Sequence, residues 1–378
     1  MYINKIKLSA TLAMLSWSVS PMAQEISPQI INGTPTNSVA WPSIAALYYD
    51  AVEYTGLYGQ YCTATILDQQ HVLTAAHCFY AEDADKLNRE NLYYTSIVLQ
   101  MSNDSQFLSG SAVTVRPSEF YVHSGYVNSA SAQGVPYPND IAIIKLEQPL
   151  NIDDRDFVTR ATSIESGVYR NTSEEFVAVG YGLTNLTRQN ATSDEDELLQ
   201  TSLSYVPKNQ CELSVGDSQL CMSGELSPQT EVRNSTCNGD SGGPLYWFNG
   251  SKYVQTGITS YGWEGCLVSA TDNLTATSAF TEVADYQGWI DSVLAGSEQP
   301  IFTVSDETRD QYYQGDEASD DGTETDNSQG TDDSASWDES ISLSSNGSSG
   351  GSTSFGMLSL LALLGVMRRK THKVIGKL

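Results

Sequence analysis

The chain has 378 residues, enough for one large domain or two ordinary ones with ample core. Its 19 Lys and Arg face 46 Asp and Glu, which gives a formal net charge of -27. A chain this acidic repels phosphate backbones, so we expect no nucleic-acid partner.

The N-terminus has the pattern of a secretory signal peptide. Lys5 and Lys7 precede an apolar run over residues 8–19, and Ala23 provides a small residue for cleavage. A buried N-terminal helix is the alternative, but the run is short and is led by lysines. We therefore expect residues 1–23 to be removed on export. Export makes the six cysteines disulfide candidates, among whose pairings the sequence alone does not choose.

Residues 30–295 predict an all-β domain. Short apolar runs with period-two alternation, such as YCTATIL and EFVAVGYG, are separated by Gly, Asn, Asp and Ser, as in a sandwich or barrel. The domain closes with the segment TEVADYQGWIDSVL. There Val283, Tyr286, Ile290 and Val293 recur at helical spacing and predict one amphipathic C-terminal helix.

Residues 296–349 form an acidic, Ser- and Asp-rich stretch whose one basic residue is Arg309. Too much charge and too little apolar surface predict a disordered linker. Calcium binding is the alternative, but DDGTETDNSQG lacks the complete loop pattern with its distal Glu.

Residues 350–378 combine Gly350 and Gly351, an apolar run over residues 355–367, and the basic cluster Arg368 to Lys370. The run reaches a membrane-spanning length only marginally, and the basic cluster would hold the C-terminus in the cytoplasm. This order resembles the GlyGly-CTERM sorting signals of secreted proteins of Gram-negative bacteria. The resemblance implies transient anchoring in the inner membrane, cleavage by a rhomboid-type protease, and export by the type II secretion system to the medium or the cell surface. A permanent membrane anchor is the alternative.

The segment TCNGDSGGPLY, residues 236–246, is the candidate reactive site. Glycines around Asp240 and Ser241 allow a close backbone approach and positive φ angles. The same letters fit the nucleophile elbow of α/β-hydrolases, where a histidine follows the serine along the chain. Only His372 does so here, inside the tail, so that interpretation fails. The order His, Asp, Ser remains.

Five segments occur in a familiar order: IING from Ile30, LTAAHC ending at Cys78, NDIAIIKL with Asp140, CNGDSGGP with Ser241, and SYG over residues 260–262. With this order and spacing, residues 30–295 resemble the chymotrypsin- and trypsin-like serine proteases. The resemblance implies two antiparallel six-stranded β-barrels and a C-terminal helix. A first barrel over about residues 30–161 would carry the base, the second would carry the serine, and the site would lie between them.

The resemblance makes His77 the general base, Asp140 its orienting carboxylate and Ser241 the nucleophile. A serine hydroxyl is too weakly acidic to attack an amide unless an imidazole takes its proton. The backbone N–H groups of Gly239 and Ser241 would form the oxyanion hole. His71 and His123 lie outside the motif, and we expect them at surface or strand positions.

The family also pairs Cys62 with Cys78, Cys211 with Cys221, and Cys237 with Cys266. No thiol is left over, which argues against a catalytic cysteine. We expect no metal or organic cofactor, and the H-E-x-x-H signature of zinc proteases is absent from the sequence. The implied partners are protein or peptide substrates and an activating protease.

Activation in this family frees an N-terminus, here at Ile30, that forms a buried ion pair with Asp240. The residue before Ile30 is Gln29, where the family usually has Arg or Lys. We therefore expect residues 24–29 to be a short propeptide that a different protease removes.

The substrate pocket predicted from the resemblance is uncharged. Ser235 stands at its base, where an Asp gives trypsin-like enzymes their preference for Arg or Lys. The pocket residues are Ser235, Thr236, Ser260, Gly262 and Ser278. We expect preference for aromatic or other apolar side chains. The alternative is a basic preference set by Glu264 or Asp272 in the neighbouring loop.

Two further functions stay open. A catalytically silent homologue acting as a binding module would normally lack one triad residue, and here all three are present. A secreted esterase of the same fold is also conceivable, because acyl transfer from esters is easier than from amides.

Overall fold

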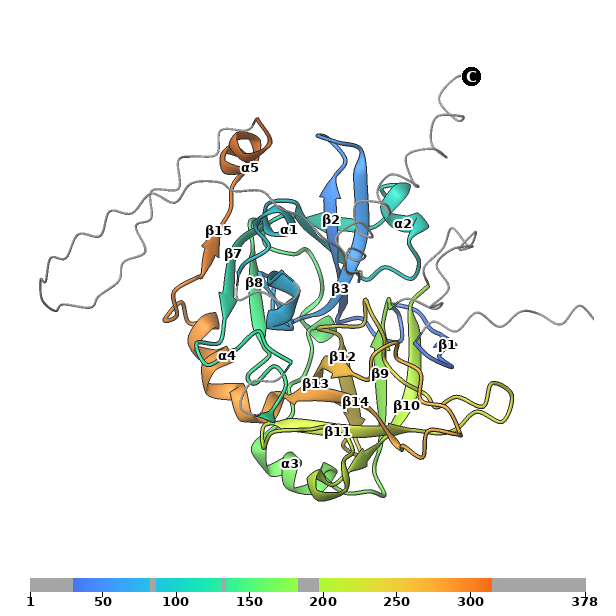
Figure 1. Ribbon diagram of the computed structural model, residues 1–378. Helices are drawn as coiled ribbons and strands as arrows, with labels where there is room; N and C mark the ends of the chain where they lie inside the picture. Colours follow the sequence, from blue (N-terminus) through green and yellow to red (C-terminus); the bar gives the residue numbers. More distant parts are fainter. Residues whose placement is uncertain (1–29, 82–85, 131–133, 183–196, 315–378) are drawn as a thin grey trace, which may run out of the picture.

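The computed structural model describes residues 30–81, 86–130, 134–182 and 197–314. The expected signal peptide, the propeptide, most of the linker and the hydrophobic tail lie outside these residues. Among the described residues, no helix has the length and apolar character needed to cross a membrane. Figure 1 shows two sheets stacked one above the other, with helices at their margins.

The first sheet is antiparallel, with the strand order β15-β7-β8-β4-β3-β2-β5-β6. Its strands are β2 (Ile44–Ala51), β3 (Leu57–Ile66), β4 (His71–Thr74), β5 (Thr95–Leu99), β6 (Val113–Val115), β7 (Pro117–Val122), β8 (Ala142–Leu146) and β15 (Phe302–Thr303). The backbone pairing does not close this sheet, because β15 and β6 are its two edges. These two short strands are additional to the expected six.

The second sheet closes into a six-stranded barrel, because β9 pairs with both β12 and β10. Its strands are β1 (Thr34–Pro35), β9 (Glu175–Gly180), β10 (Leu199–Val206), β11 (Gln219–Gly224), β12 (Pro244–Phe248), β13 (Tyr253–Gly262) and β14 (Ala276–Glu282). β1 is added outside the closed barrel, although it comes from the N-terminal segment. Alternation drives burial here: Leu199, Thr201, Leu203 and Tyr205 of β10 are buried. The predicted all-β fold with two barrel-like sheets is confirmed; the second sheet is a closed barrel and the first is an open one.

Short helices connect the strands. They are η1 (Ala76–Phe79), α1 (Arg89–Tyr93), α2 (Ser105–Leu108), η3 (Asp154–Asp156), α3 (Ser163–Tyr169), η5 (Lys208–Gln210), η6 (Val283–Tyr286), α4 (Gln287–Leu294) and α5 (Asp306–Tyr313). α3 begins with a capping box, in which Thr162 and Glu165 each accept a hydrogen bond from the other's backbone N–H.

The C-terminal helix of the barrel domain is confirmed as η6 followed by α4. Its four predicted apolar residues are all buried, and all belong to the core of the first sheet. The helix therefore leaves β14 of the second barrel and packs on the first, which couples the two halves.

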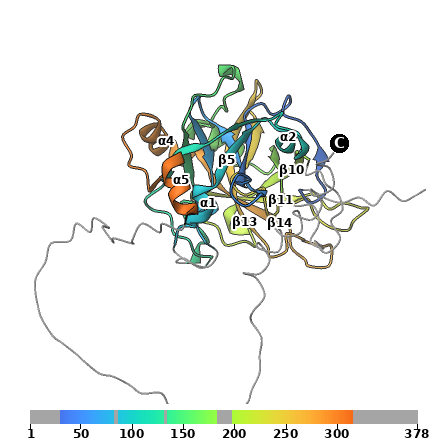
Figure 2. The ribbon, with the colours of Figure 1, turned by 90° about the horizontal axis from the view of Figure 1, so that it is seen from above.

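The expected start of the disordered linker at residue 296 is wrong. Phe302 of β15 pairs with Phe120 of β7, and α5 follows it along the first barrel. Figures 1 and 2 both place α5 beside α1. The stretch is acidic on average, but a few of its residues pack against the first barrel. The ring of Phe302 contacts that of Phe120, and Arg309 is only 2% exposed.

All three expected disulfides are present: Cys62–Cys78, Cys211–Cys221 and Cys237–Cys266. The first joins β3 to η1, and the third joins the serine loop to the loop after β13. Among the described residues no cysteine is free.

Candidate active site

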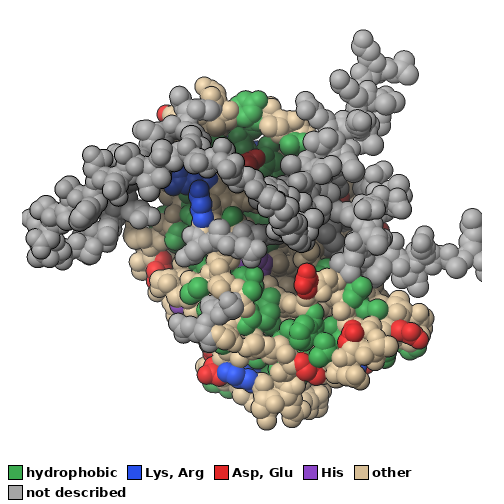
Figure 3. Space-filling model, in the orientation of Figure 1, with side chains coloured by type: hydrophobic (Ala, Val, Ile, Leu, Met, Phe, Trp, Pro, Cys, Tyr) green, Lys and Arg blue, Asp and Glu red, His purple; other side chains and the backbone are tan. Residues whose placement is uncertain are grey.

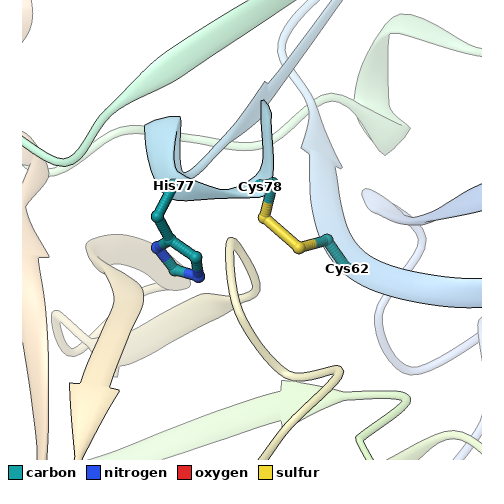
Figure 4. Close-up of side chains that lie close together, drawn as sticks. All are labelled: Cys62, His77 and Cys78. Atoms are coloured by element: carbon teal, nitrogen blue, oxygen red, sulfur yellow. A yellow bond between two sulfur atoms is a disulfide. The ribbon is translucent and has the colours of Figure 1, made fainter. Parts of the chain in front are cut away.

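His77 lies in η1, the short turn that follows β4. The neighbouring Cys78 is joined to Cys62, so the turn is tied covalently to β3, as Figure 4 shows. The two sulfur atoms lie close to the imidazole, but both belong to the disulfide and are not available as thiolate ligands for a metal. Figure 3 views the hollow between the two halves, where a histidine side chain is visible.

Asp140 is fully buried and holds the ring of His77. Its Oδ1 accepts the backbone N–H of His77 at 2.9 Å, and its Oδ2 lies 2.7 Å from Nδ1 of the ring. Ser260 of β13 donates to Oδ2 at 2.5 Å, and Thr281 of β14 donates to the backbone carbonyl at 2.8 Å. The carboxylate is thus fixed by groups of both barrels. With Nδ1 bonded to it, Nε2 is the nitrogen left for proton transfer.

The environment of His77 makes it a stronger base than an ordinary histidine. Burial acts to lower its pKa, but the charge of Asp140 and the hydrogen bond to it together outweigh burial, so the pKa lies above its usual value. A carboxylate that stabilises the imidazolium is what a general base needs during proton abstraction.

The serine loop is shaped by two glycines with positive φ, Gly239 at 96° and Gly242 at 81°. A side chain at Gly242 would overlap the hydroxyl of Thr74, so only glycine fits there. The carbonyl of Ser241 accepts the N–H of Thr63 at 2.8 Å. This bond places the loop against β3 of the first barrel.

The serine loop reaches the turn that carries His77. The carbonyl oxygen of Ser241 lies 3.9 Å from Sγ of Cys78, the residue next to His77. Among the contacts of the described residues, none joins Oγ of Ser241 to Nε2 of His77. Such bonds are often long in unliganded sites and shorten when substrate binds.

Asp240 is a buried carboxylate without a cationic partner among the described residues. Its oxygens accept the N–H groups of Gly182 and Cys237, each at 2.8 Å. Burial raises its pKa to about 7, against the opposing effect of these two bonds. Ile30 is fully buried, and Ile31 forms a β-bridge with Ser235.

The hydroxyls of Ser235, Thr236 and Ser278 form one connected group. Oγ of Ser278 lies 2.9 Å from Oγ1 of Thr236 and 3.3 Å from Oγ of Ser235, and all three residues are buried. Gly262 is exposed and pairs with Ser278 across β13 and β14. Ser260, which we expected in the pocket wall, directs its hydroxyl to Asp140.

The sequence analysis missed two aromatic residues at the site. The ring of Tyr137 lies 6.0 Å from the ring of His77 and 6.0 Å from that of Tyr261. Tyr261 is the middle residue of the SYG segment, and Tyr137 stands three residues before Asp140. Their closeness in sequence to the SYG and NDIAIIKL segments was the only signal that could have indicated them, because no sequence pattern identifies a tyrosine that lines a site.

The other two histidines lie elsewhere. His71 is a residue of β4 whose Nδ1 lies 2.9 Å from Oδ1 of Asp68. His123 follows β7, and its ring contacts those of Tyr286 and Trp289. The expectation of strand or surface positions agrees with this placement.

Comparison with known proteins gives a consistent result. Residues 30–290 match the family described as Trypsin. The chain is 27% identical over 262 residues to Brachyurin of Leptuca pugilator, covering 69% of this chain and 96% of that protein. It is 28% identical over 295 residues to Chymotrypsin-like elastase family member 1 of Macaca fascicularis, covering 76% and 97%.

Proposed function

The chain belongs to the trypsin family of serine proteases, and from this we propose that it is a secreted serine endopeptidase whose triad is His77, Asp140 and Ser241. The observation that carries the proposal is the pair formed by the buried Asp140 and the partly buried His77, with its 2.7 Å and 2.9 Å hydrogen bonds. A carboxylate this deeply buried and this closely fitted to a histidine beside a glycine-rich serine loop is suited to acyl transfer.

In the proposed mechanism, Oγ of Ser241 attacks the scissile carbonyl while Nε2 of His77 takes its proton. His77 then gives the proton to the leaving amine, and a water molecule, activated in the same way, hydrolyses the acyl-enzyme. Asp140 stays ionised and stabilises the imidazolium. The N–H groups of Gly239 and Ser241 would bind the oxyanion, and loss of one such donor costs about 10²- to 10³-fold in rate.

Labelling with a serine-reactive phosphonate, followed by mapping of the modified residue, tests the triad. The parent protein should be labelled at Ser241, and both Ser241→Ala and His77→Ala should not. If the parent protein, cleaved before Ile30, is not labelled by the phosphonate, a catalytically silent homologue is the better description. Turnover of ester substrates without turnover of any peptide library would favour the esterase.

For substrate preference, we propose a neutral pocket that accepts aromatic or other apolar side chains. The three buried hydroxyls of Ser235, Thr236 and Ser278 carry no charge and are joined through Ser278 by hydrogen bonds. The alternative, a preference for Arg or Lys, needs a free carboxylate near the pocket. Asp272 instead bonds within its own loop, where it accepts the N–H of Ser269 at 2.6 Å. Glu264 is exposed.

Cleavage-site profiling of the mature domain on a peptide library decides between the two pockets, with Ser241→Ala as the blank. Cuts mainly after Tyr, Phe or Leu would support the neutral pocket on Ser235. Cuts after Arg or Lys would contradict it and direct attention to Glu264 or Asp272.

For activation, we propose that residues 24–29 are a propeptide and that the new N-terminus at Ile30 pairs with Asp240. The burial of both residues and the unneutralised carboxylate support this. Because Gln29 does not suit a trypsin-type cut, the activating protease would differ from the enzyme itself. N-terminal sequencing of the active secreted form should begin at Ile30; a start at Gln24 would contradict the proposal.

For export, we propose that residues 1–23 are a signal peptide and that residues 350–378 are a GlyGly-CTERM-type sorting tail. The tail would anchor the protein transiently in the inner membrane of a Gram-negative cell until a rhomboid-type protease cuts it, and the type II secretion system would export the enzyme. Mass spectrometry of the released protein should show the loss of both ends. A released form that still carries the basic C-terminus would refute the sorting role.

A further inference from the structure

Gln219 is a buried side chain that links the two barrels beside the proposed active site. It is the first residue of β11 and is 4% exposed. Its Nε2 donates to the backbone carbonyls of Pro136, at 2.9 Å, and Tyr137, at 3.4 Å, in the first barrel. Its Oε1 accepts the N–H of Gly216 at 2.7 Å and the hydroxyl of Tyr261 at 3.1 Å, in the second.

These four contacts use the full hydrogen-bonding capacity of a primary amide. Such a group has two N–H donors and an oxygen with two lone pairs. Glutamate at this position offers no donor for the two carbonyls, and methionine offers neither donor nor comparable acceptor. Turning the amide over would set its NH₂ group against the N–H of Gly216. The site is therefore specific for glutamine in one orientation.

The first-barrel residue held by Gln219 has an unfavourable backbone. Tyr137 has φ of 44°, in the left-handed region that is unfavourable for a residue other than glycine. Such a conformation persists only where the surroundings fix it, and the bond from Gln219 to its carbonyl is one such constraint. The conformation brings the Tyr137 ring to 6.0 Å from that of His77.

The second-barrel residue held by Gln219 is the other wall. The hydroxyl of Tyr261 has one proton, which it shares between the carbonyl of Ser214, at 2.5 Å, and Oε1 of Gln219, at 3.1 Å. Both ends of this side chain are thus fixed, by its strand and by its hydroxyl. One amide therefore contacts both residues, whose rings lie 6.0 Å apart.

The residue paired with Gln219 across the two strands contacts Asp140 rather than the two tyrosines. Thr281 is the cross-strand partner of Gln219, and its hydroxyl donates to the carbonyl of Asp140 at 2.8 Å. The end of the β11–β14 pair thus holds the segment before β8 at two places. Thr281 holds the backbone at Asp140, whereas Gln219 holds the backbone at Pro136 and Tyr137.

We propose that Gln219 is a positioning residue that fixes the rings of Tyr137 and Tyr261 as paired walls of the substrate cleft. These walls would contact the substrate residues that precede the one in the specificity pocket. Tyr261 lies between Ser260 and Gly262 on β13, and the side chains of both tyrosines are partly exposed, so both rings are accessible to a substrate. The proposal rests on the proposed protease function.

The test compares two substrates of the activated enzyme that share the residue before the scissile bond: a single-residue ester and a tetrapeptide anilide. Gln219→Met should lower kcat/KM for the tetrapeptide at least about tenfold, mainly through KM, and change the ester value by less than about twofold. The ratio of the two values is the readout, because loss of folded enzyme lowers both equally. The phosphonate titre gives the concentration of working sites.

Gln255→Met is the matched control. Gln255 is also a fully buried glutamine that joins the barrels, since Thr65 of β3 donates to its Oε1 at 2.8 Å, but it contacts neither tyrosine. It should lower stability without changing the substrate ratio. An equal change of the ratio in both variants would show a general packing effect and overturn the proposal.

Two further variants keep the test decisive. If Gln219→Met does not fold, Gln219→Glu keeps the size and the acceptors but loses both donors, and the same fall in the ratio is expected. In a Tyr137→Ala background, Gln219 replacement should lower the ratio less than it does in the parent, because one of the two walls that Gln219 holds is already gone. An unchanged ratio in an active Gln219 variant refutes this inference alone, whereas a parent that takes no phosphonate refutes the protease function itself.

Discussion

Arg309 of α5 is buried against the first barrel, where its Nε donates a 2.7 Å hydrogen bond to the backbone carbonyl of Tyr93 in α1. The ring of Tyr93 also stacks on that of Tyr312, with centroids 4.4 Å apart. The segment that follows the expected end of the domain is thus part of its packing. Tyr54 adds a hydrogen bond from its hydroxyl to Asp310 at 2.6 Å.

Arg309→Ala should destabilise the domain by about 2–4 kcal/mol, because it removes a packed side-chain stem and leaves the Tyr93 carbonyl unpaired. Urea unfolding of the Ser241→Ala protein measures this. Arg155→Ala is the control, since Arg155 pairs with Asp153 but its side chain is 80% exposed, and it should change stability by less than about 0.5 kcal/mol. Equal midpoints for the two variants would show that α5 contributes nothing.

A second prediction concerns the buried carboxylate of Glu282 in β14. It accepts hydrogen bonds from Ser166 at 2.6 Å and Tyr169 at 2.7 Å and forms an ion pair with Arg170. Glu282→Gln should cost about 2–3 kcal/mol of stability, since it leaves the half-buried guanidinium without its counter-charge.

The exposed pair of Lys208 and Asp217 serves as the comparison for Glu282. Their side chains are 50% and 97% exposed, so Asp217→Asn should be nearly neutral. Thermal unfolding of both variants at the same pH gives the two costs. A Glu282→Gln protein as stable as its parent would show that the cluster is maintained for a reason other than stability.

The residues within sequence motifs could be predicted, because their chemistry requires particular amino acids at short spacing. Ser241 lies within a run of glycines, and His77 stands next to a cysteine that the structure shows bonded to Cys62. Gln219 was not predictable, because its role depends on carbonyls of Pro136 and Tyr137 more than eighty positions away. No local pattern distinguishes a glutamine with four partners from one on the surface.

The docking of α5 escaped sequence reasoning for a related reason. Composition averages over a window, and the window from residue 296 is acidic and polar. Phe302 and Arg309 fold against the barrel because β7 offers a free edge and α1 offers a carbonyl and a ring. Both depend on surfaces that exist only once the first barrel has formed.

A third prediction uses the pKa of His77. Asp140→Asn should lower kcat by about 10⁴, because the ring loses both its orientation and the correct tautomer. The acid limb of the kcat/KM profile should move to lower pH in the residual activity. Asp140 is what raises the pKa of His77 against burial, so its removal leaves burial alone to lower that pKa.

Asp68→Asn is the control for Asp140, because Asp68 makes a similar contact to His71 outside the site. It should leave both kcat and the acid limb in place. A residual activity of Asp140→Asn whose acid limb does not shift would mean that the limb reports another group than His77.

The last prediction follows from the raised pKa of Asp240. In the chain that has not been cleaved before Ile30, the folded state binds the Asp240 proton more tightly than the unfolded state does. Its contribution to stability is therefore complete below the unfolded pKa of 3.8 and is lost as pH rises to about 7. Relative to Asp240→Asn, the uncleaved protein should lose up to about 4 kcal/mol between pH 4 and pH 7.5.

Cleavage before Ile30 should reverse this trend, because an ammonium beside Asp240 favours the ionised carboxylate and lowers its pKa. Urea unfolding of the Ser241→Ala protein at both pH values, before and after cleavage, separates the two states. Asp240→Asn removes the titrating group, and the difference between parent and variant cancels every other carboxylate. If cleavage leaves that difference unchanged at pH 7.5, the ammonium of Ile30 does not reach Asp240, and the serine loop is ordered by some other contact.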